Sequence, residues 1–584
     1  MSRGGTADIP AARISSRNSS SRISLEPRLG ERQTPPIFKF PVDIFYLASL
    51  IEYKSMNNIS RKQDKFVSST ARVSIGTLVS RLFGLARDLI FAYLFGTSLA
   101  SDAFNLAFRI PNIFRGLLGE GAFFAAFVPK YTGYITNPRE KDRANPLASW
   151  VLIVLVGALA VITVLGVVFA EPIVSVFAYG WRSYPEKFSL TVGLTRLLFP
   201  YIFLVGIAVF FSGVLNSHKR FFVPAISPVM LNIFWIASML VGFFLFRERG
   251  AGFLIQLTAI GVLAGGFFQF VIQAPFVKKV GFSLSFRKGM FRESLEVWRL
   301  LLPATVGFAA FQVNRLIDAF LASFLPEGSV SALQYGNRLV LFPLAMFGTA
   351  IATVSLPYMS ESVAKGDTAS LAHSLYRSLR LVILVLLPIS LYTILLRYPI
   401  IQLIFERGQF TRAHSTPMTA IALGFYAVGL AAYGGVKVAS QAFYSMKDTK
   451  TPVKIAVGAM LVNVVLNIIL MFPLKHGGLA LASSIASFFN LILLLSIFSR
   501  RNRSFRVWKL LGFGLQVLVL SLISLIPAYI LLGVLKSAIG DVGILPNLAL
   551  FVIPSVVGLS IYGFLIWILK LADSSFDRGK DRDY

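Results

Sequence analysis

Long apolar segments recur along this chain and restrict it to one class of fold. About fourteen stretches of roughly 20 or more mainly apolar residues follow one another, and a helix needs about that length to cross a bilayer. Hydrophobic residues fill 55% of the 584 positions, and the mean hydropathy is +0.71. This composition excludes an ordinary soluble domain. The sequence therefore predicts an all-α polytopic membrane protein with about fourteen transmembrane helices.

The apolar runs locate the expected spans along the chain. They lie near 71–97, 103–133, 149–170, 189–215, 222–246, 252–276, 297–324, 329–358, 374–396, 416–443, 452–473, 477–499, 508–534 and 547–570.

The net charge of +29 does not indicate a nucleic-acid partner. Lysine and arginine gather in alternate connecting segments, such as "SHKRF", "KDTKTPVK" and "SRRNRSFRVWK", whereas "FGTSLAS", "SFLPEGS" and "PLKHGG" carry little charge. This bias follows the positive-inside rule of inner-membrane proteins. We therefore expect both termini in the cytoplasm, which agrees with an even number of spans.

The ends of the chain differ in composition from its middle. Residues 1–66 are polar, basic and rich in serine, and they lack the apolar core of a signal peptide. We expect a disordered basic extension there, with Met56 as an alternative translation start. Residues 573–584 are expected to form a short cytoplasmic tail.

A weak internal repeat relates residues 70–280 to residues 298–505 at an offset of about 228. It pairs Lys219 with Lys447 and Pro224 with Pro452, within "LNSHKRFFVP" and "FYSMKDTKTP". A repeat of this length indicates a duplicated bundle of six helices. The sequence predicts two pseudo-symmetric six-helix lobes, at 67–283 and 284–505, followed by two additional helices in 506–572. Two such lobes that rock about a central site are a common route to alternating access.

The first two spans contain charged residues where lipid contact would be expensive. The first holds Arg81, Arg87 and Asp88, and the second holds Asp102, Arg109, Arg115 and Glu120. A charge at the bilayer centre costs at least about 2.5–3.5 kcal/mol, so such residues face a bundle interior or a wet cavity. Arginines outnumber carboxylates, and the planar guanidinium group suits phosphate. These helices predict a cationic chamber for an anionic substrate.

Two roles for these charges stay open at the level of sequence. Asp88 and Asp102 are explained as well by ion pairs that hold the bundle together. Arg87, Arg115 and Arg338 are less easily neutralised and are the better candidates for ligand contact. We predict that Arg81, Arg87 and Arg115 point into one cavity.

The second half contains a candidate cation site. Asp318 lies in the seventh expected span, and Asn463 and Asn467 lie four residues apart on the eleventh, so both amides face the same way. Carboxylate and amide oxygens, with Ser483 or Ser484 nearby, are suitable ligands for Na⁺. Interhelical hydrogen bonding between these polar groups is the alternative.

Nothing in the sequence indicates an enzyme or a resident cofactor. The chain has no cysteine, its four histidines are scattered, and it lacks the sequence motifs of the common hydrolases and nucleotide-binding proteins. We therefore expect no catalytic residue.

Several motifs resemble the MurJ (MviN) family of bacterial lipid II flippases, within the MOP exporter superfamily. They are "SRLFGLARD", "SDAFNLAFRIPNIFRGLLGEGAFFAAFVP", "GNRLVLFPLAMFGTAIATVSLPYMS" and "FYSMKDTKTPVKIA", and the resemblance runs from about residue 70 to the C-terminus. It implies fourteen helices, of which the last two frame a lipid groove. It also implies that Arg81, Arg87, Arg115 and Arg338, with the acids Asp102 and Glu120, line the cavity. One helix-eleven position that is acidic in family members with a Na⁺ site is an amide here.

The resemblance implies that the protein moves lipid II, the undecaprenyl-pyrophosphate-linked peptidoglycan precursor, from the cytoplasmic to the periplasmic leaflet of the inner membrane. Lipid II and membrane lipid are then its partners, and the cell-wall synthesis machinery is a further candidate. One rival is a cation-coupled exporter of drugs or polysaccharide lipids from the same superfamily. A membrane enzyme acting on lipid pyrophosphates is less consistent with the sequence, because it would need clustered acids with a metal.

Overall fold

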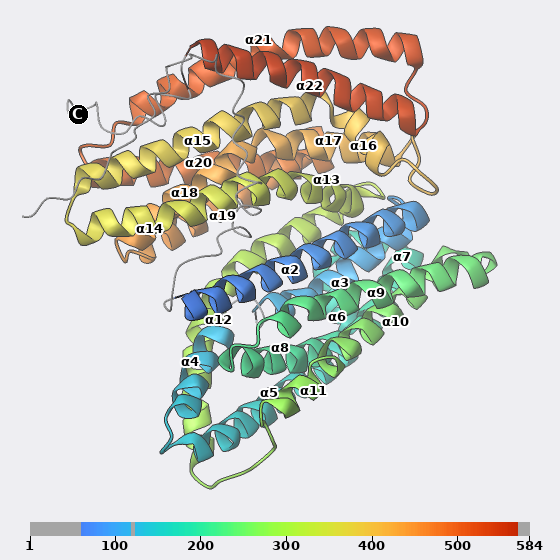
Figure 1. Ribbon diagram of the computed structural model, residues 1–584. Coiled ribbons are helices and arrows are strands. Elements are labelled where there is room, and N and C mark those ends of the chain that lie inside the picture. Colours follow the sequence, from blue (N-terminus) through green and yellow to red (C-terminus); the bar gives the residue numbers. More distant parts are fainter. Residues whose placement is uncertain (1–59, 118–122, 570, 572–584) are drawn as a thin grey trace, which may run out of the picture. The chain divides into compact units, whose positions relative to one another are not determined.

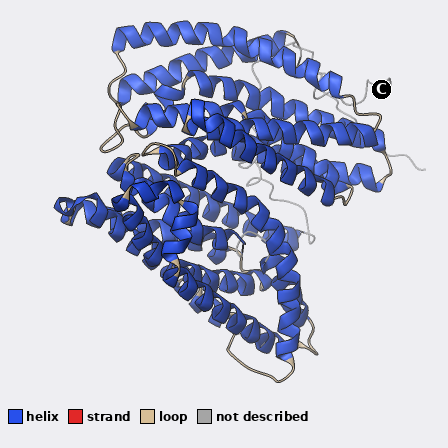
Figure 2. Ribbon diagram, turned by 180° about the vertical axis from the view of Figure 1, so that it is seen from behind, coloured by secondary structure: helices blue, strands red, loops and turns tan. Residues whose placement is uncertain are grey.

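The computed structural model describes residues 60–117, 123–569 and 571. The described residues form α-helices joined by short turns, with a few single turns of 3-10 or π helix and no strand (Figures 1 and 2). Residues Val67–Tyr584 make up one compact unit. The prediction of an all-α protein is confirmed. The expected extension at 1–66 lies almost entirely outside the described residues, and Glu120 and the whole tail at 573–584 lie outside them as well.

Helices α2 to α11 form the first half of the unit. They are α2 (Ser60–Phe95), α3 (Leu99–Leu117), α4 (Phe123–Thr136), α5 (Ala144–Val168), α6 (Ala170–Phe177), α7 (Pro185–Leu198), α8 (Tyr201–Ser217), α9 (Phe222–Leu245), α10 (Gly250–Val271) and α11 (Ala274–Lys279).

Helices α12 to α20 form the second half, and two long helices follow it. They are α12 (Met290–Ala322), α13 (Ser329–Pro343), α14 (Ala350–Ala364), α15 (Thr368–Leu395), α16 (Arg397–Ile404), α17 (Ser415–Val428), α18 (Leu430–Ser445), α19 (Lys450–Leu474), α20 (His476–Arg501), α21 (Val507–Ile539) and α22 (Ile544–Ile568).

Within the described residues, ten helical segments are long and apolar enough to cross a membrane, and the bent pair α17 and α18 makes an eleventh. Three further expected spans correspond to α2, to α3 with α4, and to α12. These helices carry the intramembrane charges, which lower their hydropathy. The protein is thus a multi-pass membrane protein, while a count of fourteen spans stays a prediction.

The two halves repeat the same local structure at the expected offset. Lys219 follows α8 and Lys447 follows α18, and both adopt a left-handed backbone, with φ of 59° and 60°. A non-glycine residue with positive φ is uncommon, so the coincidence is informative. Pro224 and Pro452 also occupy the first turns of α9 and α19, where proline costs no hydrogen bond.

Helices α21 and α22 pack beside each other and against the second half (Figure 1). The Tyr392 hydroxyl of α15 donates to the carbonyl oxygen of Ser524 on α21 at 2.9 Å, and the Tyr562 hydroxyl of α22 donates to that of Leu384 at 2.8 Å. The opposite faces of these helices expose large apolar side chains, including Leu515, Tyr529 and Trp567. Such faces suit contact with lipid acyl chains.

Candidate functional site

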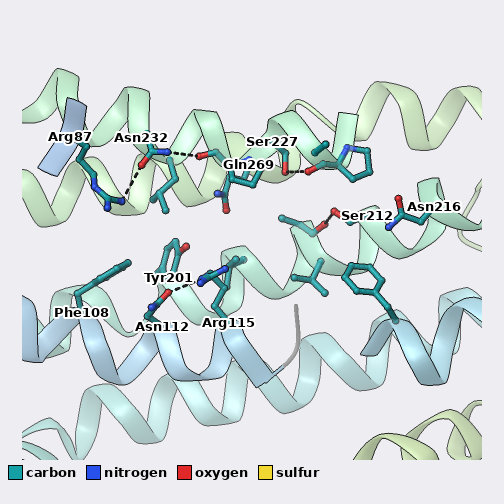
Figure 3. Close-up of a pocket in the computed structure, with 18 of the residues that line it drawn as sticks. Arg87, Phe108, Asn112, Arg115, Tyr201, Ser212, Asn216, Ser227, Asn232 and Gln269 are labelled. Carbon is teal, nitrogen blue, oxygen red and sulfur yellow. Dashed lines mark hydrogen bonds between the residues drawn. The ribbon is translucent and has the colours of Figure 1, made fainter. Parts of the chain in front are cut away.

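A cavity of about 590 Å³ lies among the helices of the first half. Helices α3, α8 and α9 supply most of its wall, and α2, α4, α10 and α13 complete it. The polar residues that line it are Arg87, Asn112, Arg115, Tyr201, Ser212, Asn216, Ser227, Asn232, Gln269 and Arg338 (Figure 3). No carboxylate is among its described lining residues, whereas three of them, Arg87, Arg115 and Arg338, carry guanidinium groups.

Arg87 and Arg338 share one carboxylate at the edge of the cavity. Asp88 Oδ1 accepts from Arg87 Nη2 at 2.7 Å, and Asp88 Oδ2 lies 2.7 Å from Arg338 Nε. The Arg87 and Asp88 side chains are only 12% and 15% exposed, whereas Arg338 is 44% exposed. Two arginines from different halves therefore compete for one negative charge, and the group keeps a net positive charge.

Two further contacts fix the position of Arg87. Its Nη1 donates to Asn232 Oδ1 at 3.0 Å, and its guanidinium carbon lies 4.3 Å from the centre of the Trp235 ring. A cation over an aromatic face is attracted by the ring quadrupole. Asn232 and Trp235 both belong to α9, so α9 holds Arg87 in place before any ligand binds.

Arg115 approaches the cavity from α3. Its Nε donates to Asn112 Oδ1 at 2.7 Å, one helical turn earlier. Figure 3 shows Asn112 and Arg115 across the cavity from Asn232 and Gln269. Guanidinium groups thus approach the same space from opposite walls, an arrangement that suits a ligand with more than one phosphate oxygen.

Arg81 and Arg109 lie elsewhere. Arg81 is exposed and is not among the described lining residues, unlike Arg87 and Arg115, with which it was expected to share the cavity. Arg81 lies six positions before Arg87 on α2, and at 100° per residue the two side chains point about 120° apart. Arg109 is half-buried on α3 and lies within electrostatic range of the Tyr426 hydroxyl in the second half.

Asp102 connects the two halves and does not line the cavity. Its carboxylate is 1% exposed and pairs with Lys187 Nζ at 2.7 Å. It also accepts from the backbone N–H groups of Gly328 and Ser331, at 2.8 and 2.9 Å, at the start of α13. The sequence left an ion-pairing role open for Asp88 and Asp102, and the structure places both in ion pairs.

A second carboxylate makes the same kind of contact between the two halves in the opposite direction. Glu327, just before α13, accepts from the backbone N–H of Leu99 at the start of α3 at 2.6 Å. Each half therefore supplies a carboxylate to the helix N-terminus of the other, where unpaired N–H groups favour a negative charge. Gly328 has φ of +87°, and a Cβ there would lie 2.6 Å from the Thr97 carbonyl oxygen. The turns meet too closely for a larger residue.

The candidate cation ligands come together in the second half. Asn467 Nδ2 donates to Asp318 Oδ1 at 2.7 Å and to Asn463 Oδ1 at 3.1 Å, and Asn463 Nδ2 donates to Ser483 Oγ at 3.3 Å. This is the interhelical network that the sequence offered as the alternative to a Na⁺ site. The buried Asn467 Oδ1 has no hydrogen-bond partner within the described structure, so an oxygen ligand remains available to a hard cation.

Several functional candidates were not singled out from the sequence. Asn232, Trp235 and Gln269 are polar or aromatic positions on otherwise apolar helices, and that contrast is the signal that would have identified them. Lys187 lies just before an expected span, where a lysine is normally exposed. Its burial beside Asp102 depends on tertiary packing, which the sequence pattern does not show.

The fold and the cavity define a class: a polytopic membrane transporter with an arginine-lined cavity among the helices of its first half. Comparison with known proteins identifies the family. The profile of the lipid II flippase MurJ family matches residues 91–551. The lipid II flippase MurJ of Burkholderia cenocepacia is 35% identical over 427 residues, which is 72% of this chain and 81% of that protein. The chain belongs to the MurJ family.

Other relatives agree. A probable lipid II flippase MurJ of Vibrio cholerae is 35% identical over 443 residues, covering 74% of this chain and 82% of that protein. A solved lipid II flippase MurJ in an inward closed conformation has a TM-score of 0.70 and 28% identity, covering 85% of this chain and 98% of that one. An inward-facing MATE multidrug transporter of the MOP superfamily, at 16% identity and a TM-score of 0.58, shares the fold alone.

Proposed function

We propose that this protein translocates lipid II from the cytoplasmic to the periplasmic leaflet of the inner membrane by alternating access. Membership of the MurJ family supports the substrate, because the matched relatives are named as lipid II flippases. The observation that carries the proposal is the cavity wall, to which Arg87, Arg115 and Arg338 bring three guanidinium groups from both halves of the chain.

The chemistry of the substrate fits this wall. A lipid-linked sugar pyrophosphate has a large polar head that cannot cross hydrocarbon unaided, and its two phosphates carry the charge that guanidinium groups bind best. The polyprenyl chain needs no chamber and can stay in lipid beside α21 and α22. No covalent step is required.

The charge bias of the connecting segments orients the cycle. The turn before α3 and the turn before α13 contact each other, and both belong to the weakly charged segments. The positive-inside rule favours the periplasmic side for such segments. The Asp102 and Glu327 contacts then close that side, and the cavity belongs to the state that receives substrate from the cytoplasm. Exchange of sides requires these contacts to separate.

A Na⁺ ion is a candidate coupling ion for this cycle. Asp318, Asn463, Asn467 and Ser483 would hold it through oxygen atoms, and it would link α12 to α19 and α20. Only Asp318 contributes a formal negative charge, so weak affinity is expected. The ion would favour whichever arrangement of the two halves binds it more tightly, by an amount set by the difference in its affinity for the two arrangements.

A drug exporter of the same superfamily is the rival function. Cationic drugs need acidic groups in the cavity, and the described wall has none. Depletion of the protein in its own host distinguishes the two functions. A flippase predicts accumulation of lipid II in the inner leaflet with phospholipid synthesis intact, whereas unchanged lipid II on depletion would contradict the proposal.

A further inference from the structure

A second cavity, of about 360 Å³, lies where α16 and the start of α17 meet the turn between α21 and α22. Its described lining includes the charged residues Arg412, Lys536 and Asp541 and the apolar residues Leu395, Leu532 and Leu550. None of these residues lines the arginine cavity of the first half. The pocket is therefore a separate site.

Two cations and one carboxylate are among the described residues that line this pocket. Asp541 forms ion pairs with Arg412 and with Lys536, the latter at 3.2 Å. Burial alone would raise the pKa of the Asp541 carboxyl, but the bonds from Arg412 and Lys536 outweigh it and lower that pKa. Glu406, which accepts from the hydroxyl of the lining residue Thr416 at 2.7 Å, is a second carboxylate behind the wall. The described lining itself keeps one net positive charge beside an open volume.

The rest of the pocket and its surroundings are apolar. Leu395, Leu532 and Leu550 are among its lining residues. Ile530 and Val534, on the outer face of α21, are 58% and 56% exposed, and Leu545 on α22 is 77% exposed. A cationic pole beside helices whose outer faces are apolar suits an amphiphile with a phosphate head, rather than a free anion.

We propose that this pocket binds the headgroup phosphate of an anionic phospholipid, with its acyl chains along α21 and α22. Arg412 and Lys536 contact the phosphate, while Asp541 holds both cations in place when the lipid is absent. Because the pocket joins the second half to the α21–α22 pair, the lipid stabilises that packing. By the charge bias of the connecting segments, the lipid comes from the periplasmic leaflet. This proposal depends on the membrane setting and not on lipid II transport.

The experiment uses the full chain in neutral detergent, with dioleoylphosphatidylglycerol or dioleoylphosphatidylcholine added to the micelles. Native mass spectrometry measures bound lipid, and thermal unfolding measures Tm. Phosphatidylglycerol should bind in preference to phosphatidylcholine and raise Tm. The triple variant Arg412→Gln/Lys536→Gln/Asp541→Asn, which leaves no unpaired charge, should lose the preference by about tenfold, the usual effect of removing charged hydrogen bonds.

A second variant separates lipid binding from a simple ion-pair clamp. Asp541→Asn keeps both cations and removes their competitor, so it should bind phosphatidylglycerol more tightly than the wild type. A clamp without a ligand would instead show a lower Tm and no change in lipid preference. Arg182→Gln, an exposed arginine of the corresponding first-half segment, is the matched control and should behave as wild type.

Three results would overturn the proposal. The first is equal binding of the two lipids by the wild type. The second is an unchanged preference in the triple variant. The third is full competition by glycerol 1-phosphate at the same concentration, because that would show a site for a free anion.

Discussion

Arg338 on α13 lies 2.7 Å from Asp88 on α2, Nε to Oδ2, and this pair joins the two repeated halves at the edge of the cavity. Asp88 also holds Arg87. A pyrophosphate that enters the cavity can replace Asp88 as the partner of either arginine. Substrate charge would then contact residues of both halves, which rock against each other in alternating access.

Breaking the buried pair between Asp102 and Lys187 should destabilise the protein strongly. Asp102→Asn leaves Lys187, which is 5% exposed, without its counter-charge, and losses of about 3–5 kcal/mol are typical for such changes. Thermal unfolding in detergent measures the effect. The double variant Asp102→Asn/Lys187→Met should recover part of the loss, because no buried charge then lacks a partner. A single variant as stable as the wild type would contradict this role.

Sodium should stabilise the wild type and not Asp318→Asn. The substitution removes the only formal charge among the candidate ligands while keeping a similar side-chain shape. Tm measured in NaCl and in choline chloride gives the comparison, and KCl controls for ionic strength. If both proteins respond equally to sodium, no ion binds at Asp318.

Asp448, in the turn between α18 and α19, should make stability depend on pH below about 4. Bonds from the Thr451 hydroxyl, from Arg501 and from the Thr451 N–H lower the pKa of the Asp448 carboxyl from its ordinary value of 3.8. A lowered pKa in the folded state adds stability above the unfolded pKa, and this stability is lost as pH falls through the folded pKa. Asp448→Asn should therefore lower Tm at pH 7, and the difference should narrow toward pH 3. A constant difference would disagree with this assignment.

The sequence predicted those features of the fold that depend on local composition. Apolar segments of spanning length predicted the helices, and the offset that pairs Lys219 with Lys447 predicted the repeated turns. Arg338 was also identified as a cavity candidate, and it does line the first-half cavity. Its partner Asp88 lies 250 positions earlier, so the contact follows from the tertiary structure and from no local pattern.

Features that depend on side-chain direction or on distant contacts were harder to predict. Arg81 shares a helix with Arg87, but the six-residue spacing turns it toward another face. Asp102 belongs to a cavity-lining helix, yet its carboxylate accepts from the N–H of Gly328, just before α13. Gly328 lies 226 positions later in the sequence. No pattern in the sequence predicts that the N-terminus of α13 lies beside the Asp102 carboxylate.

Transport of lipid II is expected to depend on the cavity arginines. The most direct test measures the lipid II that reaches the periplasmic leaflet in a strain that depends on this protein, at matched membrane levels of each variant. Arg338→Ala should abolish transport while the protein stays folded and inserted. Arg338→Lys should rescue only part of it, since an ammonium group cannot bind phosphate bidentately. Arg196→Ala, at an arginine that is 51% exposed on α7, should transport normally. Wild-type transport by Arg338→Ala would contradict the account.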